Sequence, residues 1–191
     1  MRLYDLRTEY RVNPIGLTAK TPRFSWKMES QENDTLQTAY EIHVIDENGK
    51  LVWNSGKRAS DQSVLIPYEG EALASETLYT VQVSVADNHG NTESVEGTFE
   101  TGIFDNTEFK AQMITGDFPE EETACPVFGK TFVLDKKVKK ARLYATAHGV
   151  YEVTLNGQTV GDCRMAPGWT SYHNRLQYQI YDVTEMLAAD N

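Results

Sequence analysis

Polar and apolar residues alternate along most of this chain, and that period of two limits the fold more than any other feature. The alternation is clear at 24–28, 40–44 and 79–85, where the apolar positions are Phe24, Trp26 and Met28, then Tyr40, Ile42 and Val44, then Tyr79, Val81, Val83 and Val85. Such a pattern is typical of antiparallel strands with one face buried and one face in water. We therefore predict an all-β chain.

Turn sequences separate the alternating segments at short intervals. Asn48-Gly49, Ser55-Gly56 and the stretch 87–91 punctuate the first half, and Asn156-Gly157 punctuates the second. Asn-Gly supplies the positive φ angles of a tight hairpin. Short strands at this spacing predict two antiparallel β-sandwich domains, 1–103 and 104–191.

The second block begins with a polar stretch that we expect to be irregular through Glu122. Further strands are predicted at 130–134, 140–145, 150–155 and 176–181, with a hairpin at Asn156-Gly157. Asp182 followed by Glu185 resembles a capping box and predicts a helix near the end.

Composition excludes several classes of function. With 18 Lys+Arg against 28 Asp+Glu the net charge is −10, which opposes binding to nucleic acid. No apolar run has the roughly 18–20 residues of a membrane-spanning helix. The N-terminal residues carry charge where a signal peptide would be apolar, so we expect a cytoplasmic protein. Cys125 and Cys163 have no basic neighbour in sequence and are expected to be buried thiols.

No cofactor or metal site is predicted. The four histidines lack metal-ligand spacing, and the chain contains neither a glycine-rich phosphate loop nor a nucleophile elbow. Its 28 acidic residues form many pairs, and the sequence selects none of them as the two carboxylates of a glycosidase.

The first block resembles a fibronectin type III, immunoglobulin-like sandwich. The segment 73–79, which leads straight into the strand of Val81, Val83 and Val85, is similar to the tyrosine corner of such domains. The resemblance implies that Tyr79 is buried and that its hydroxyl is bonded to backbone upstream. Trp26 takes the place of the core tryptophan.

A resemblance to bacterial α-L-rhamnosidases of glycoside hydrolase family 78 extends over the whole chain. It rests on an ordered series of short motifs: Asn13-Pro14-Ile15-Gly16-Leu17, Pro22-Arg23-Phe24-Ser25-Trp26, Gln37-Thr38-Ala39-Tyr40, Val52-Trp53-Asn54-Ser55-Gly56-Lys57, Ser60-Asp61-Gln62-Ser63, Ala141-Arg142-Leu143-Tyr144, Tyr151-Glu152, Leu155-Asn156-Gly157, Ala166-Pro167-Gly168-Trp169-Thr170-Ser171-Tyr172, and Arg175, Tyr178 and Tyr181-Asp182-Val183-Thr184.

This resemblance implies that the second block is a carbohydrate-binding-like jelly-roll domain. It also implies a catalytic (α/α)6 barrel that inverts the anomeric carbon and carries both catalytic carboxylates. The chain stops at Asn191, before that barrel and before the later jelly-roll strands. We therefore expect an N-terminal fragment with an incomplete jelly roll and no catalytic residue of its own.

The segment from Met165 to Tyr178 has the best claim to contact a ligand. Sugars bind through an aromatic platform and hydrogen-bonding side chains around it, and this segment has both. The candidate carbohydrate-binding residues are Trp169, Tyr172, Arg175 and Tyr178. The competing interpretation is that the aromatic residues pack the domain core or the contact with the missing barrel.

Two functions remain open from the sequence. The chain is either the non-catalytic N-terminal part of an α-L-rhamnosidase, which supports the catalytic barrel, or a free-standing carbohydrate-binding or adhesion module. A jelly roll needs roughly eight strands, and only about five or six are visible. We therefore also expect the second block to associate with another copy through an open sheet edge, or to be weakly ordered near Asn191.

Overall fold

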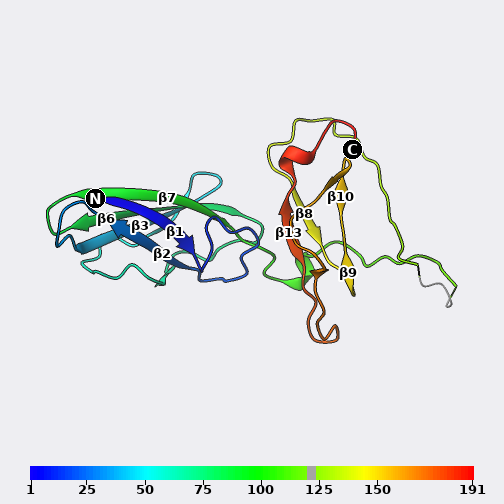
Figure 1. The fold of residues 1–191 in the computed structure, drawn as a ribbon, viewed down its shortest axis with the longest axis horizontal. Helices are drawn as coiled ribbons and strands as arrows, with labels where there is room; N and C mark the ends of the chain where they lie inside the picture. Colours follow the sequence, from blue (N-terminus) through cyan, green and yellow to red (C-terminus); the bar gives the residue numbers. More distant parts are fainter. Residues whose placement is uncertain (120–123) are drawn as a thin grey trace. The chain divides into compact units, whose positions relative to one another are not determined.

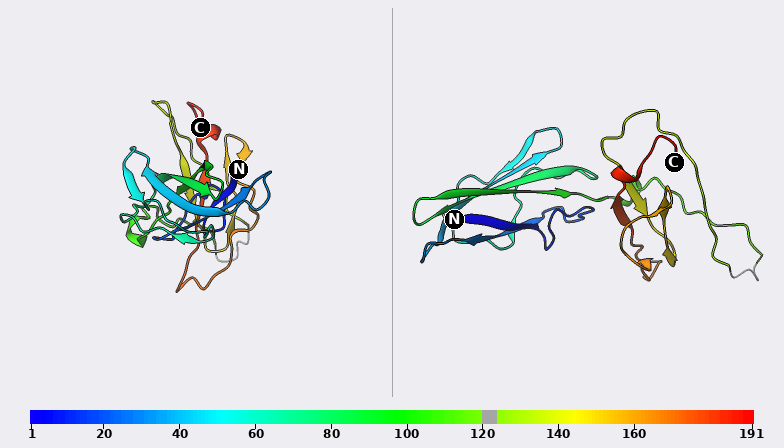
Figure 2. Two further views of the ribbon diagram at one scale, coloured as in Figure 1. Left: turned by 90° about the vertical axis from the view of Figure 1, so that its left-hand side faces the viewer. Right: turned by 45° about the horizontal axis from the view of Figure 1, so that its top comes forward.

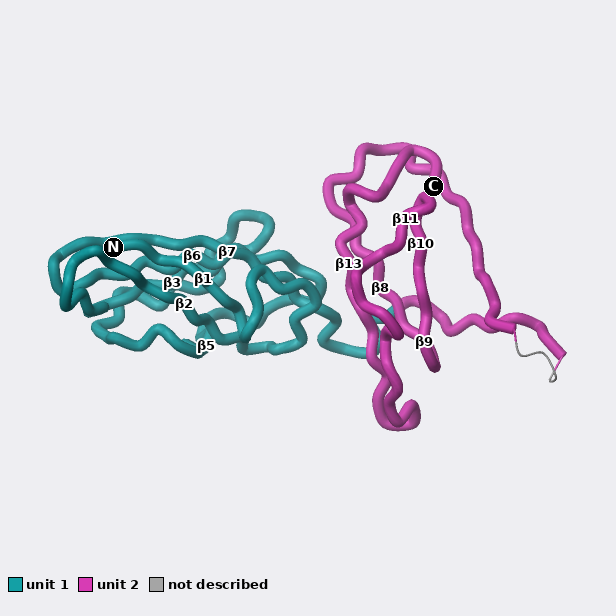
Figure 3. Tube along the Cα trace, viewed as in Figure 1, with its two compact units in different colours: residues 1–109 teal, residues 110–191 magenta. Residues whose placement is uncertain are grey.

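The structure of the chain is a computed structural model that describes residues 1–119 and 124–191. The chain divides into two compact units, Met1–Phe109 and Lys110–Asn191 (Figures 1 and 3). The sequence places the boundary at residue 103, six residues earlier. The end of the predicted irregular stretch, at residues 120–122, lies outside the described residues.

Unit 1 is a sandwich of two antiparallel sheets. One sheet has the strand order β1-β2-β5 and the other has the order β4-β3-β6-β7, and the two layers are visible in Figure 2. The strands are β1 (Arg2–Thr8), β2 (Arg23–Glu29), β3 (Gln37–Asp46), β4 (Leu51–Asn54), β5 (Ile66–Pro67), β6 (Leu78–Asp87) and β7 (Thr92–Glu100). A 3-10 turn, η1 (Asn106–Glu108), follows β7.

The period-two pattern produces the core of unit 1. Along β6 every second residue is buried, and Val81, Val83 and Val85 are fully enclosed. Phe24 and Trp26 reach the same core from β2, in the opposite sheet. The all-β, antiparallel prediction is confirmed, and Trp26 occupies the predicted core position.

The segment between β1 and β2 is fastened to the end of β7. Glu100 N donates to Pro14 O over 2.8 Å, Leu17 N donates to Glu100 O over 2.9 Å, and Gly102 N donates to Leu17 O over 2.8 Å. The side-chain oxygen of Asn13 accepts from Thr98 N at 2.9 Å. These bonds close one end of the sandwich.

Unit 2 contains short antiparallel pairs. The pairs are β8 (Arg142–Ala145) with β13 (Gln179–Asp182), β9 (Val150–Tyr151) with β12 (Ala166–Pro167), and β10 (Thr154–Leu155) with β11 (Gln158–Thr159). The hairpin at Asn156-Gly157 is confirmed, with φ values of 50° and 78°. Both angles are positive, as a type I′ turn requires.

Three local predictions for unit 2 need correction. The predicted strand 150–155 is divided into β9 and β10, and the predicted strand 130–134 forms only an isolated bridge, Val133 with Asp190. The predicted helix is a single 3-10 turn, η2 (Thr184–Met186), whose N-cap is Val183. Thr184 N donates to Asp182 Oδ1 over 3.0 Å, and this bond does not begin a longer helix.

Apolar burial is sparse in unit 2. Among its described residues, the buried apolar ones are Val160, Ala166, Pro167 and Val183. Cys125 and Cys163 are exposed, so the prediction of buried thiols is wrong.

Asn191 is hydrogen-bonded to Phe132. Phe132 N donates to Asn191 O and Asn191 N donates to Phe132 O, each over 3.0 Å. No helix within 1–119 or 124–191 is long and apolar enough to span a membrane.

Candidate functional site

The predicted binding segment is a loop that leaves β12 and returns at β13. Gly168 has a φ of +97°, a left-handed conformation that glycine adopts without strain. Past it, Thr170 Oγ1 donates to Arg175 O over 2.6 Å, and the backbone N–H of Arg175 donates to Ser171 O over 2.8 Å. The loop is therefore closed on itself between residues 170 and 175.

Three rings meet on this loop, and we call His148, Trp169 and Tyr172 the ring cluster. The Tyr172 and His148 rings lie nearly parallel, with centroids 4.5 Å apart and an interplanar angle of 6°. Tyr172 Oη accepts from Gly149 N at 2.6 Å, which holds the phenol in place. Trp169 lies 6.3 Å from Tyr172, and 81% of Trp169 is exposed. One large indole thus stands in solvent beside a fixed pair of rings.

Arg175 lies on this loop, and its guanidinium contacts the side chain of Gln177. When the Gln177 amide is oriented so that its nitrogen donates to Pro167 O at 2.9 Å, its oxygen accepts from Arg175 Nη2 at 3.2 Å. Arg175 is itself exposed. The guanidinium is therefore positioned by the loop and keeps further donors for a ligand.

Tyr178 lies in a different environment. Its ring stacks on Tyr144 of β8, with centroids 6.2 Å apart and an interplanar angle of 25°. Both rings are partly buried at the β8–β13 pair. Of the four predicted residues, Trp169 and Tyr172 are in ring contact, Arg175 lies on the same loop, and Tyr178 packs against the sheet.

His148 is the residue that sequence reasoning missed. It lies between β8 and β9, 24 positions before Tyr172, and its contact with Tyr172 depends on the β9–β12 pairing. Period-two patterns give strands but not the partner of each strand, so no local signal identifies His148 as a member of the cluster.

The chemistry of the ring cluster suits binding rather than catalysis. Its members supply two aromatic rings and an imidazole, but no pair of carboxylates. An exposed indole stacks on the C–H face of a sugar, and neighbouring polar groups bond its hydroxyls. In the described part of the chain, no group of three His, Cys, Asp or Glu residues could hold a metal ion.

A half-buried tyrosine on β9 bonds to side chains of β13. Burial raises the pKa of Tyr151 on β9, and a hydrogen bond with Tyr181 over 3.1 Å raises this pKa further. Tyr151 Oη also donates to Gln179 Oε1 over 2.9 Å. Tyr151 therefore remains a neutral phenol that joins β9 to β13.

Two family models match the chain. The model for the Rha78A-like, N-terminal immunoglobulin domain matches residues 3–105, and the model for the alpha-L-rhamnosidase N-terminal domain matches residues 136–191. The first model covers more than half of the chain, and together the two account for both units.

Several known proteins are similar to the chain. An alpha-L-rhamnosidase from Formosa agariphila is 35% identical over 195 residues, and one from Alteromonas sp. is 33% identical over 193. Each alignment covers 92% of this chain and 21% of the relative. The chain therefore spans about a fifth of the length of these curated relatives.

Solved structures agree with these relatives. The alpha-L-rhamnosidase from Dictyoglumus thermophilum superposes with a TM-score of 0.85 at 34% identity, over 98% of this chain and 24% of that one. The enzyme from Aspergillus terreus gives a TM-score of 0.84 at 33% identity, over 98% and 22%. The chain belongs to the α-L-rhamnosidase family, in which it corresponds to the N-terminal immunoglobulin-like domain and residues of the N-terminal domain that follows it.

Proposed function

We propose that this chain is the non-catalytic N-terminal part of an enzyme that hydrolyses terminal α-L-rhamnosyl groups from glycosides and inverts the anomeric carbon. The observation that carries the proposal is the match of both units, in order, to N-terminal domains of α-L-rhamnosidases. The matched relatives and solved enzymes are about four to five times longer than this chain. The two units would support a separate catalytic domain.

An activity assay tests this proposal. The isolated chain should release no chromophore from an aryl α-L-rhamnoside, because its best candidate site holds no pair of carboxylates. A polypeptide that continues from this chain through a catalytic domain should release it, with inversion visible by NMR of the newly formed rhamnose. Turnover by the isolated chain that is lost on substitution of one of its own carboxylates would overturn the proposal.

We also propose that the ring cluster contacts carbohydrate. The support is the 81% exposure of Trp169 beside the fixed Tyr172–His148 pair, because an accessible indole ring supplies the apolar surface on which a sugar stacks. Trp169→Ala should weaken retention of the chain on immobilised rhamnoside. Tyr178→Phe is the matched control, since the Tyr178 ring packs on Tyr144 and keeps that contact.

The same exposed indole favours the second candidate function, a free-standing carbohydrate-binding module. The two functions differ in what Trp169→Ala does. In a support domain the change lowers the activity of the longer enzyme on large substrates only modestly, whereas in a binding module it removes carbohydrate binding at the ring cluster.

Association between copies is a further proposal for unit 2. Among its described strands, β9 pairs only with β12, and Val150 on β9 is exposed. A strand with an open edge and an apolar side chain is a template for pairing with another chain.

A cytoplasmic location is also proposed. Its support is that Cys125 and Cys163 are free and exposed, as thiols are in a reducing compartment, and cell fractionation tests it.

A further inference from the structure

Unit 1 contains a hollow that the proposed function does not use. Its volume is about 240 Å³, and it lies where the edge strands β4 and β5 of the two sheets come near each other. We call it the edge pocket. Its lining residues are Tyr40, Trp53, Ser55, Arg58, Gln62, Ile66, Pro67 and Glu69.

The floor of the edge pocket is apolar and firmly packed. Trp53 and Tyr40 are 7% and 9% exposed. The Trp53 ring stacks on Phe24 with centroids 6.1 Å apart and meets Tyr68 edge-on at 5.2 Å. These contacts hold the floor in one arrangement, so a ligand would not have to order it.

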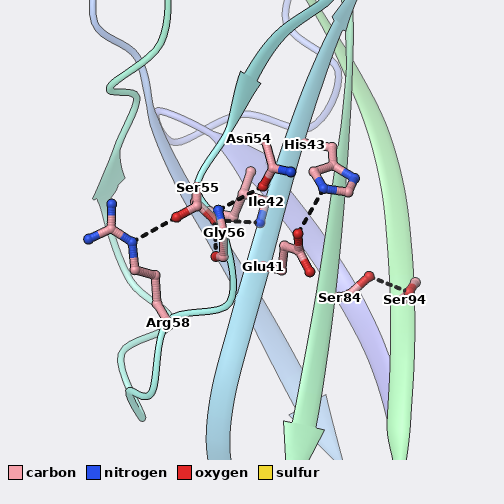
Figure 4. A network of polar contacts seen from close by, with 9 residues as sticks. All are labelled: Glu41, Ile42, His43, Asn54, Ser55, Gly56, Arg58, Ser84 and Ser94. Carbon is pink, nitrogen blue, oxygen red and sulfur yellow. Dashed lines mark hydrogen bonds and ion pairs between the residues drawn. The ribbon is translucent and has the colours of Figure 1, made fainter.

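One wall is a loop fixed by its own polar contacts (Figure 4). Ser55 Oγ accepts from Ile42 N at 2.8 Å and donates to Gly56 O at 2.8 Å. Arg58 Nε then donates to Ser55 O over 2.8 Å, which orients the guanidinium. Arg58 is thus fixed through Nε, and its Nη2 faces Glu69 at the rim.

The rim keeps unused hydrogen-bonding capacity. Arg58 Nη2 lies 3.4 Å from Glu69 Oε2, longer than the usual 2.7–2.9 Å of a charge-assisted bond. The exposed Gln62 amide has no side-chain partner among residues 1–119 and 124–191. The rim therefore offers a guanidinium, a carboxylate and a primary amide side by side.

The mixture of groups selects the kind of ligand. Arg58 and Glu69 form an ion pair whose opposite charges offset each other, so neither an anion nor a cation is favoured at the rim. A neutral molecule with several hydroxyls both donates to Glu69 and accepts from Arg58, and Gln62 does either. About 240 Å³ is below the roughly 300–1,000 Å³ of drug-sized sites, which limits the ligand to about one ring.

We propose that the edge pocket binds a neutral, polyhydroxylated ring, a single sugar unit, seated beside Trp53 and Tyr40 with its hydroxyls on Arg58, Gln62 and Glu69. The site lies wholly within unit 1. It is independent of the ring cluster in unit 2 and of any catalytic activity.

Titration followed by NMR tests the proposal on the full 191-residue chain. The probes are L-rhamnose and D-glucose as neutral rings, with D-glucuronate and D-glucosamine as the charged counterparts. A ligand of about a dozen heavy atoms binds in the millimolar range. The neutral sugars should produce saturable shifts at the Trp53 indole N–H and the Gln62 side-chain amide, and the charged sugars much weaker ones.

Substitutions separate this site from others. Glu69→Gln should weaken binding about tenfold, because it replaces a charged acceptor by a neutral amide of the same size. Glu71→Gln is the matched control, since Glu71 pairs with Lys50 and does not line the pocket. Trp169→Ala should leave the Trp53 shifts unchanged, which separates this result from any failure of the ring cluster.

Three results would overturn the proposal. They are the absence of saturable shifts at Trp53 with both neutral sugars, preferential binding of a charged sugar, and equal binding by the Glu69→Gln and Glu71→Gln variants.

Discussion

Tyr79 Oη accepts a hydrogen bond from the backbone N–H of Ala74, five residues upstream, over 2.9 Å. Tyr79 is 3% exposed, and its ring stacks on Phe99 with centroids 5.1 Å apart. This is the tyrosine corner expected from the sequence, and it is confirmed. The bond joins the loop before β6 to the core that β6 and β7 enclose.

Tyr79→Phe should therefore destabilise unit 1. The ring and its stacking on Phe99 remain, but Ala74 N loses its acceptor, at a cost of about 1–3 kcal/mol in the free energy of unfolding. Urea denaturation followed by tryptophan fluorescence measures this. Tyr4→Phe is the control, since the described residues give the Tyr4 hydroxyl no hydrogen-bond partner; an equal loss in both variants would contradict the prediction.

The ion pair of Glu9 and Arg23 should make unit 1 sensitive to acid. Hydrogen bonds from the Arg23 guanidinium, one of them 2.5 Å long, hold the pKa of Glu9 below its ordinary value of 4.5. The carboxylate therefore stabilises the fold above about pH 4.5, and this contribution disappears as the pH falls through the lowered pKa.

Glu9→Gln should lower the free energy of unfolding at pH 7 and converge with the unsubstituted chain near pH 2. Denaturation curves across this range measure the difference. Glu29→Gln, in the exposed pair with Arg2, should change little at any pH. A difference for Glu9→Gln that stays constant down to pH 2 would disprove the linkage.

Gly70 allows the chain to pass against the core. A Cβ at this position would lie 2.5 Å from both Trp53 Cβ and Tyr68 Oη. Gly70→Ala should destabilise unit 1 by about 1–3 kcal/mol through overpacking. Gly129→Ala, where a Cβ meets nothing within 4 Å, is the control. A thermal melt that shows Gly70→Ala unchanged would mean that the loop shifts freely.

Unit 2 should unfold before unit 1. Few of its described apolar residues are buried, whereas unit 1 encloses the large cluster around Phe24 and Val83. Buried apolar area is the main favourable term in folding. Scanning calorimetry should show two transitions, and Tyr79→Phe in unit 1 should shift only the second. A single transition common to both units would contradict this.

Self-association should depend on β9. Val150→Lys places a charge on its open edge and should shift sedimentation toward the monomer. Val12→Lys is a matched control, because Val12 is 58% exposed and Val150 is 54% exposed. A chain that is monomeric before either substitution would show that the edge is not used.

The sequence was informative where one face of a strand is buried. Alternation around Val81 and Val83 predicted β6, because the pattern lies within a few residues. Asn156-Gly157 predicted the hairpin of β10 and β11 for the same reason. The strand at 150–155 was predicted whole but is divided into β9, which pairs with β12, and β10, which pairs with β11. Pairing between distant segments leaves no mark on local periodicity.

The candidate site shows the same limit. Composition identified the loop of Trp169 and Tyr172, because aromatic residues concentrate there. It could not separate Tyr178, which packs on Tyr144, from the exposed Trp169, since both are aromatic residues in one short segment. The edge pocket around Trp53 was missed because it depends on where the edges of two sheets meet.

The bonds that fasten the segment 13–17 to β7 carry a consequence for folding during synthesis. Asn13 and Thr98 are 85 positions apart, so the ribosome must release almost the whole of unit 1 before they can meet. The β6–β7 hairpin closes locally, but the segment 13–17 can bond to β7 only after a long loop closes, which is slow. During that interval the apolar face of β2 is open to other nascent chains, and a chaperone that covers it would raise the yield of folded protein.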